Sequence, residues 1–538
     1  MSRTFWNRWG PWLALGASLI ALNASVAFAN VWPTPGIRLT GALSVELAVG
    51  ILLLAASPRW AGRLSGRVLP TLWVVLVAGH YLDVTASGLY GRDFNLYWDS
   101  RHLGNVAAML ARAASIWLVV AAGVGLVGIV AAAFVLARMA LGRVARAMDR
   151  RRPRLVLTAA AAAVVVLFTG QQLSSQFPAT LTFADPVTPA YARQTRFVLA
   201  TLGPSGVAPP LGASPNLHSS LNGLHGADVL LVFLESYGAV THETPAIADR
   251  LVEPRADLAT AVHDTGRDVL SAYVDSPTVG ASSWLAHLSL ISGVEVRDQY
   301  AYTSLMASDR ETLVANFARR GYRTVALMPG LRQAWPEGAF YGFDAIYGRD
   351  ALEYTGPQFG WWSIPDQYAL AKLDELERDR TPRAPLFAVF PTSTGHAPFG
   401  PVPPYQDDWS RVLGSEAYDE ADVDRAMAAR PDLANLRPSY IQAMSYEYRS
   451  LAGYLQEHAD DDLLLIALGD HQPPTAVSGR NVAWTVPVHV FGRSGPVLDR
   501  LVKAGFQPGL NPRRPPIGAM HELAPLFLDA FGATDGDP

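Results

Sequence analysis

Five apolar stretches occupy the first third of the chain. They cover residues 10–29, 37–56, 69–89, 113–139 and 155–171. A helix needs about 20 apolar residues to cross a membrane, and each stretch is close to that length. Five buried helices of this kind in succession would be unusual in a soluble protein. We therefore predict five membrane-spanning helices.

Arginine residues gather in alternate loops between these stretches. Two precede the first stretch, three lie at 59–67, and six lie at 143–154. Loops rich in Arg and Lys stay on the cytoplasmic side. The region after the fifth stretch is then predicted to lie outside. We expect a multi-pass protein of the inner (plasma) membrane whose C-terminal domain is extracytoplasmic, on the periplasmic side.

The hydrophobic pattern changes after a segment rich in Pro, Thr, Ser and Gly, which we interpret as a linker. Short continuous apolar runs then alternate with helical patterns, as is typical of a parallel sheet whose strands are buried on both faces. We predict a transmembrane domain (1–174), a linker (175–226) and an α/β domain (227–538) with a mostly parallel central sheet. The predicted strands are 228–234, 323–328, 386–390, 463–468 and 486–491.

Composition agrees with a chain that is partly membrane-embedded and partly globular. Of its 538 residues, 50% are hydrophobic and only 17% are charged. The net charge of -4 gives no reason to expect a nucleic-acid partner. The chain has no cysteine, which excludes disulfides, thiolate metal ligands and a cysteine nucleophile.

Polar side chains follow three of the predicted strands where they end. Glu235 follows the first, His396 the third, and Asp470-His471 the fourth. In open α/β sheets, ligand sites form at the carboxyl ends of strands. Carboxylate oxygens and imidazole nitrogens suit Zn²⁺ or Mn²⁺. Taken alone, Glu235 fits a helix cap equally well, and a loop histidine is often only a surface residue.

A further candidate lies in the segment 277–293, where small polar residues lead into an apolar helical pattern. A hydroxyl at the start of such a helix lies beside free backbone N–H groups and the positive end of the helix dipole. An attacking oxygen with a bound anion would be placed there. Ser282 and Ser283 both fit this position, and each could instead be a simple N-cap.

Together these motifs resemble the alkaline phosphatase superfamily in its sulfatase-like branch. The closer likeness is to membrane-anchored members, the lipoteichoic acid synthases and the phosphoethanolamine transferases. The resemblance implies a divalent metal, Mn²⁺ or Zn²⁺ with Mg²⁺ also compatible, held by Glu235, Ser283, Asp470 and His471. The interval from Ser283 to the later Ser-Gly pair selects it over Ser282 as the nucleophile.

The resemblance also implies roles on the substrate side. His396 is expected to contact the substrate and to take part in catalysis, and Arg332 and Trp335 are expected to bind phosphate. Sulfatases that convert a residue to formylglycine have a different motif from the one here, where Leu285 and His287 stand. Sulfate-ester hydrolysis by the formylglycine route is therefore not expected.

The implied function is a membrane-bound, metal-dependent phosphoryl-group transferase with a serine nucleophile. It would act on a membrane lipid headgroup and on an envelope glycan or lipid acceptor. One alternative is a phosphate- or sulfate-ester hydrolase of the same family. An alternative of another class is a non-catalytic membrane scaffold, against which the complete set of Glu, Ser, Asp and His residues argues.

Overall fold

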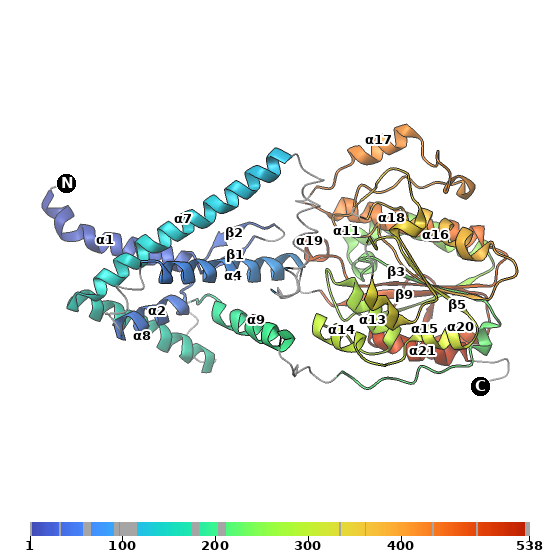
Figure 1. Cartoon of the computed structure of the whole chain (residues 1–538), viewed down its shortest axis with the longest axis horizontal. Coiled ribbons are helices and arrows are strands. Elements are labelled where there is room, and N and C mark those ends of the chain that lie inside the picture. The colour runs from blue at the N-terminus through green and yellow to red at the C-terminus, as the bar shows by residue number, and fades with distance from the viewer. Residues whose placement is uncertain are drawn as a thin grey trace. The chain divides into compact units, whose positions relative to one another are not determined.

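A computed structural model describes residues 3–31, 34–56, 66–90, 96, 100, 116–173, 182–202, 211–332, 335–360, 362–432, 435–479 and 482–532. The chain divides into two compact units, Met1–Gly206 and Val207–Pro538. Each unit has its own hydrophobic core. Figure 1 shows the elements of both.

The N-terminal unit is mainly helical. In this unit α1 packs against α7, α4 packs against α7, and α2 packs against α8. Its elements are α1 (Arg3–Ala24), β1 (Phe28–Asn30), β2 (Ile37–Leu39), α2 (Val45–Ala56), α4 (Val68–Tyr90), α7 (Ile116–Met148), α8 (Arg151–Leu173) and α9 (Val187–Leu202).

Within the described residues, three helical segments are long and apolar enough to cross a membrane: Val68–Ser87, Val120–Met148 and Arg151–Leu173. The predicted count of five is not confirmed. The second predicted stretch contains β2, which pairs with β1, and leaves α2 with only 12 residues. At about 1.5 Å per residue, α2 is much shorter than the roughly 30 Å hydrocarbon core of a bilayer.

The C-terminal unit is an α/β domain. Its strands are β3 (Asp228–Leu234), β4 (Asp268–Asp275), β5 (Arg323–Met328), β6 (Ala345–Gly348), β7 (Leu386–Pro391), β8 (Leu463–Gly469), β9 (Thr485–Gly492) and β10 (Gln507–Pro508). Its helices are α10 (Val240–Glu243), α11 (Pro245–Ala248), α12 (Val252–Asp264), α13 (Ser283–Ser292), α14 (Gln299–Met306), α15 (Leu313–Arg319), α16 (Asp366–Leu373), α17 (Glu420–Ala428), α18 (Arg437–Glu457), α19 (Thr475–Ser478), α20 (Pro496–Lys503) and α21 (Leu523–Phe531).

One eight-stranded sheet organises this unit, in the order β10-β4-β9-β8-β3-β7-β5-β6. The pairs β3/β7, β3/β8, β5/β6 and β5/β7 are parallel, whereas β9 and β10 run against their neighbours. The mostly parallel sheet and the five predicted strands are therefore confirmed. Because β3, β4, β7 and β8 share one direction, their carboxyl ends meet at one edge of the sheet.

Two helical layers cover the sheet (Figure 1). Helices α13, α15, α20 and α21 contribute to the hydrophobic cluster on one face. Helices α12, α16 and α18 contribute to the cluster on the other. The strand β3 is buried over its whole length, in agreement with its unbroken apolar sequence. The loops that leave the sheet edge are thus anchored by strands fixed on both faces.

Candidate metal and nucleophile site

Glu235 is the first residue after β3. The residue is 8% exposed, and its backbone N–H donates to Thr392 Oγ1 at 3.1 Å. Ser236 has a positive φ of 61°, which turns the chain, and its hydroxyl donates to Glu235 Oε1 at 3.0 Å. The end of β3 therefore fixes the position of a buried carboxylate.

Asp470 and His471 follow β8, the parallel neighbour of β3, and both are buried. Asp470 Oδ1 accepts the N–H of Ser236 at 2.8 Å and the N–H of His471 at 2.6 Å. His471 Nδ1 lies 2.8 Å from the carbonyl of Gln472. Because a carbonyl can only accept, Nδ1 donates this bond, and Nε2 is the ring nitrogen that faces the site. Nε2 lies 3.5 Å from Glu235 Oε1.

Ser283 is the first residue of α13. Its hydroxyl donates to Glu235 Oε2 at 2.9 Å and lies 3.2 Å from His471 Nε2. Ser282, the N-cap residue, has a positive φ of 70° and forms no side-chain capping bond. Ser282 therefore occupies the N-cap position without a capping bond from its side chain, whereas the Ser283 hydroxyl bonds across to the loop after β3.

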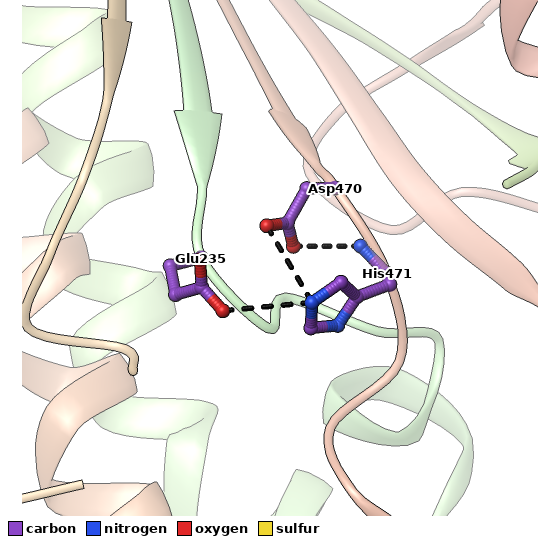
Figure 2. A group of neighbouring side chains, drawn as sticks. All are labelled: Glu235, Asp470 and His471. Atoms are coloured by element: carbon purple, nitrogen blue, oxygen red, sulfur yellow. Dashed lines mark hydrogen bonds and ion pairs between the residues drawn. The ribbon is translucent and has the colours of Figure 1, made fainter. Parts of the chain in front are cut away.

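The three residues Glu235, Asp470 and His471 each offer a ligand atom, and these atoms lie within 4.8 Å of one another (Figure 2). Asp470 Oδ2 is buried and has no hydrogen-bond partner. Burial, and then the charge of Glu235, raise the pKa of Asp470 well above its usual value. A buried carboxylate oxygen without a hydrogen bond is costly. The residues therefore fit a divalent cation, which would satisfy this oxygen.

His287 is a neighbour of this group that the sequence analysis assigned no role. It lies one helical turn after Ser283, and its ring packs 4.3 Å from that of Phe233. Its Nε2 lies 3.9 Å from Asp470 Oδ2, and it too is buried without a hydrogen-bond partner. Burial lowers the pKa of His287 to about 4, so it is neutral at physiological pH. The i,i+4 spacing from Ser283 was the available signal.

His396 lies in the loop after β7. Its Nδ1 donates to Ala397 O at 2.7 Å, and its ring is 5.5 Å from Trp362, edge to face. The guanidinium of Arg332 lies 5.8 Å from the centre of the same Trp362 ring. Burial opposes ionisation of Glu235, but His471 and His396 lower its pKa below the usual value. His396 and Arg332 thus meet at Trp362, which the sequence analysis did not identify.

Trp335 is placed differently from Arg332. Its ring packs 5.1 Å from that of Tyr341 and against a hydrophobic cluster of the domain core. This packing gives Trp335 a structural role that requires no bound ligand. The phosphate-binding role of Trp335 stays a prediction.

Two glycines bring the loops of the site into backbone contact. A Cβ atom at Gly469 would overlap the carbonyl oxygen of Tyr237, and one at Gly395 would overlap the carbonyl oxygen of Glu235. The loops after β7 and β8 therefore lie directly against the loop after β3. Glycine is required at both positions because any side chain would push these loops apart.

A buried pair of carboxyl groups supports the loop that carries His396. Asp366 accepts the N–H and hydroxyl of Ser393 at 2.7 and 3.0 Å and the N–H of Thr394 at 2.8 Å. Glu447 is 2% exposed. Burial, and then the charge of Asp366, raise the pKa of Glu447 well above its usual value. Since Asp366 receives several donors, we assign the proton to Glu447, which can then donate to Asp366.

We expect Glu447→Gln to fold and to be more stable than the native protein at pH 8. A raised carboxyl pKa means that the native protein loses stability as pH rises above the pKa of the unfolded chain, about 4.3. The amide cannot ionise, so the advantage of the variant should shrink towards pH 4. Unfolding by denaturant at several pH values measures this difference. A variant advantage that grows on acidification would contradict the assignment.

A family model described as Sulfatase matches residues 288–486. A comparison with curated proteins finds no match.

Among solved structures, the lipoteichoic acid synthase LtaP from Listeria monocytogenes is similar at 15% identity and a TM-score of 0.37, over 61% of this chain and 76% of that one. The lipooligosaccharide phosphoethanolamine transferase EptA from Neisseria meningitidis is similar at 15% identity and a TM-score of 0.45, over 90% and 88%. The phosphoglycerol transferase GacH from Streptococcus pyogenes has 12% identity and a TM-score of 0.35, over 65% and 87%.

The matched segment begins inside α13 and ends at the second residue of β9, so it includes His396, Asp470 and His471. The resemblance to the sulfatase family that the sequence motifs imply is therefore confirmed over residues 288–486 of the C-terminal unit. The chain thus combines a C-terminal segment similar to the sulfatase family with helices that, within the described residues, are long and apolar enough to cross a membrane.

Proposed function

We propose that this enzyme transfers a substituted phosphoryl group from a membrane lipid headgroup to an envelope glycan or lipid, with Ser283 as the nucleophile. The observation that carries the proposal is the position of the Ser283 hydroxyl. It lies 2.9 Å from Glu235 Oε2 and 3.2 Å from His471 Nε2, at the first residue of a helix. Free N–H groups at such a helix start favour a bound anion.

Glu235, Asp470 and His471 would hold a divalent cation, with the Ser283 oxygen completing the group. Mixed oxygen and nitrogen ligands favour Zn²⁺ or Mn²⁺, and Mg²⁺ is also compatible. When bound, such a cation acts as a Lewis acid and lowers the pKa of a coordinated hydroxyl. His471 is already oriented for this role, because its Nδ1–H is fixed on the carbonyl of Gln472 at 2.8 Å.

The residues of the chain suit a double displacement. Glu235 accepts the Ser283 hydrogen bond, which leaves an oxygen lone pair free to attack phosphorus. The serine proton passes through Glu235 to the lipid alcohol as its bond to phosphorus breaks, so diacylglycerol leaves and Ser283 carries the substituted phosphoryl group. An acceptor hydroxyl then attacks that phosphorus, and its proton returns to the oxygen of Ser283, which regenerates the serine. His396 and Arg332 would bind the non-bridging phosphate oxygens and stabilise their charge.

The membrane helices support a lipid substrate, because they confine the enzyme and the lipid to one plane. The arginine-rich loops favour a C-terminal domain on the periplasmic side of the inner membrane. A hydrolase of phosphate or sulfate esters is the second candidate, since water can replace the acceptor hydroxyl at the same phosphoserine. Leu285 and His287 argue against formylglycine chemistry within that alternative.

Product analysis separates the two. The full chain, reconstituted in lipid nanodiscs with Zn²⁺ or Mn²⁺, is supplied with headgroup-labelled phosphatidylethanolamine or phosphatidylglycerol and an envelope extract. A transferase yields diacylglycerol and a labelled glycan or lipid, whereas a hydrolase yields diacylglycerol and free labelled headgroup phosphate. A native protein that consumes neither lipid, while the same preparation binds metal, would overturn the proposal.

A further inference from the structure

A basic cavity that is open to the surface lies in the N-terminal unit, between the middle of α1 and the turn from α7 to α8. Its volume is about 710 Å³. Residues of α1 form one side, and the end of α7 with the start of α8 forms the other. Five arginines line it: Arg143, Arg146, Arg150, Arg151 and Arg152. Its volume is within the roughly 300–1,000 Å³ of small-ligand sites.

The positive charge of this cavity is not compensated by acidic side chains. Among the residues that the structure describes, no Asp or Glu lines it, and the acidic residue of the same turn, Asp149, is not a lining residue. Across the part of the chain that the structure describes, none of these five arginines forms an ion pair. Arg143 donates to the Ser18 hydroxyl at 3.4 Å, and Arg146 donates to the Gly142 carbonyl at 3.1 Å, both neutral acceptors. An anion between the guanidinium groups would relieve their mutual repulsion.

The remainder of the lining is apolar. Trp12, Ala14 and Leu15 of α1 contribute to it, and Leu15 is 7% exposed and belongs to the hydrophobic core of this unit. Tryptophan is enriched where a membrane protein meets lipid headgroups. A free inorganic anion would form no favourable contacts with this apolar side of the cavity. A ligand with a charged head and an apolar chain would contact both sides.

The start of α8 adds a second source of positive potential. Arg151 and Arg152 are its first two residues, so its unsatisfied backbone N–H groups are near the cavity. The partial charge at a helix N-terminus favours phosphate. Guanidinium groups bind phosphate oxygens in pairs.

We propose that this cavity binds the headgroup of an anionic phospholipid, with the phosphate among the arginines and the start of an acyl chain along Trp12 and Leu15. The positive loops of membrane proteins attract anionic lipid surfaces in general. The cavity adds to this attraction a shape that selects one lipid molecule. The inference is independent of the proposed catalysis, because it concerns binding in the N-terminal unit alone.

Calorimetric titration of the full chain in neutral detergent tests the inference. The probes are water-soluble dioctanoyl-phosphatidylglycerol, dioctanoyl-phosphatidylcholine and inorganic phosphate. We expect phosphatidylglycerol to bind at least about tenfold more tightly than either of the others. The double variant R146Q/R150Q should weaken phosphatidylglycerol binding by about 30-fold, since each arginine near a membrane surface contributes about 1 kcal/mol. R154Q is the matched control, because Arg154 lies in the same segment but outside the lining.

Three results would overturn the inference. Equal binding of the two lipids would show that the arginines do not select the headgroup. Phosphate binding as tight as lipid binding would indicate a free-anion site. A loss in R154Q equal to that in the double variant would indicate only a general charge effect. If R146Q/R150Q fails to fold, R146Q alone, with an expected loss of about fivefold, decides the matter.

Discussion

Ser283→Ala is expected to lower turnover by at least about 10⁴-fold, because it removes the attacking oxygen. The three proposed metal ligands Glu235, Asp470 and His471 remain in place, so the variant should still bind the cation. Headgroup release from labelled lipid measures the first effect. Metal content of the purified variant after dialysis measures the second.

Ser282→Ala is the matched control for this experiment. It removes a hydroxyl from the adjacent residue, which forms no side-chain capping bond. We expect its turnover to stay within a few-fold of the native value, because no part of the reaction is assigned to it. Near-normal turnover in Ser283→Ala, or equal losses in the two variants, would refute the nucleophile assignment.

Asp470→Asn is expected to weaken metal binding by more than about 100-fold, above the range for residues that only orient a ligand. The amide has the shape of the carboxylate but lacks its charge, so the loss reports coordination and not packing. Activity should fall in parallel. Isothermal titration with Zn²⁺ and Mn²⁺ measures the affinity. Asp462→Asn is the control, since the Asp462 side chain is 82% exposed just before β8.

The thermal stability of the same variant gives a result that a purely structural role would not produce. With metal, the native protein should have the higher melting temperature, because binding stabilises the folded state. With a chelator, Asp470→Asn should be at least as stable as the native protein, since it removes the unpartnered buried oxygen Oδ2. The same order of stability in both conditions would mean that Asp470 does not serve a cation.

The central strands were predictable because each is a short apolar run buried on both faces. The run at 228–234 coincides with β3, and the prediction at 463–468 lies within β8. The strand β4 was not predicted, because Ser271 interrupts its apolar sequence. In the fold that hydroxyl donates to Gly509 O and lies 2.6 Å from His489 Nδ1. Such partners are distant in sequence, so the pattern alone does not show that a polar residue fits the strand.

The convergence of Glu235, Asp470 and His471 was predictable for a geometric reason. Parallel strands end at one edge of a sheet, and these residues follow two such ends. Trp362 and the carboxyl pair Asp366–Glu447 were not predictable as partners of the His396 loop. They reach it from separate helices and loops, and nothing in their local sequence indicates where those segments pack.

The number of membrane helices could not be predicted from hydrophobicity alone. Hydrophobicity counted over 37–56 suggested a full span, yet residues Ile37–Leu39 form the strand β2. An apolar count does not distinguish a helix from a helix preceded by a short hairpin. Within the described residues, the three helices that are both long and apolar enough to cross a membrane contain no such hairpin.

The left-handed backbone at Ser236 and Ser282, with φ values of 61° and 70°, has a consequence for attempts to make this enzyme heat-resistant. A non-glycine residue in this conformation costs on the order of 1 kcal/mol. A screen that rewards melting temperature alone would therefore favour glycine at both sites. Each site directly adjoins Glu235 or Ser283. A glycine selected for stability would therefore make the backbone more flexible beside an oxygen that the proposed reaction needs in a fixed position.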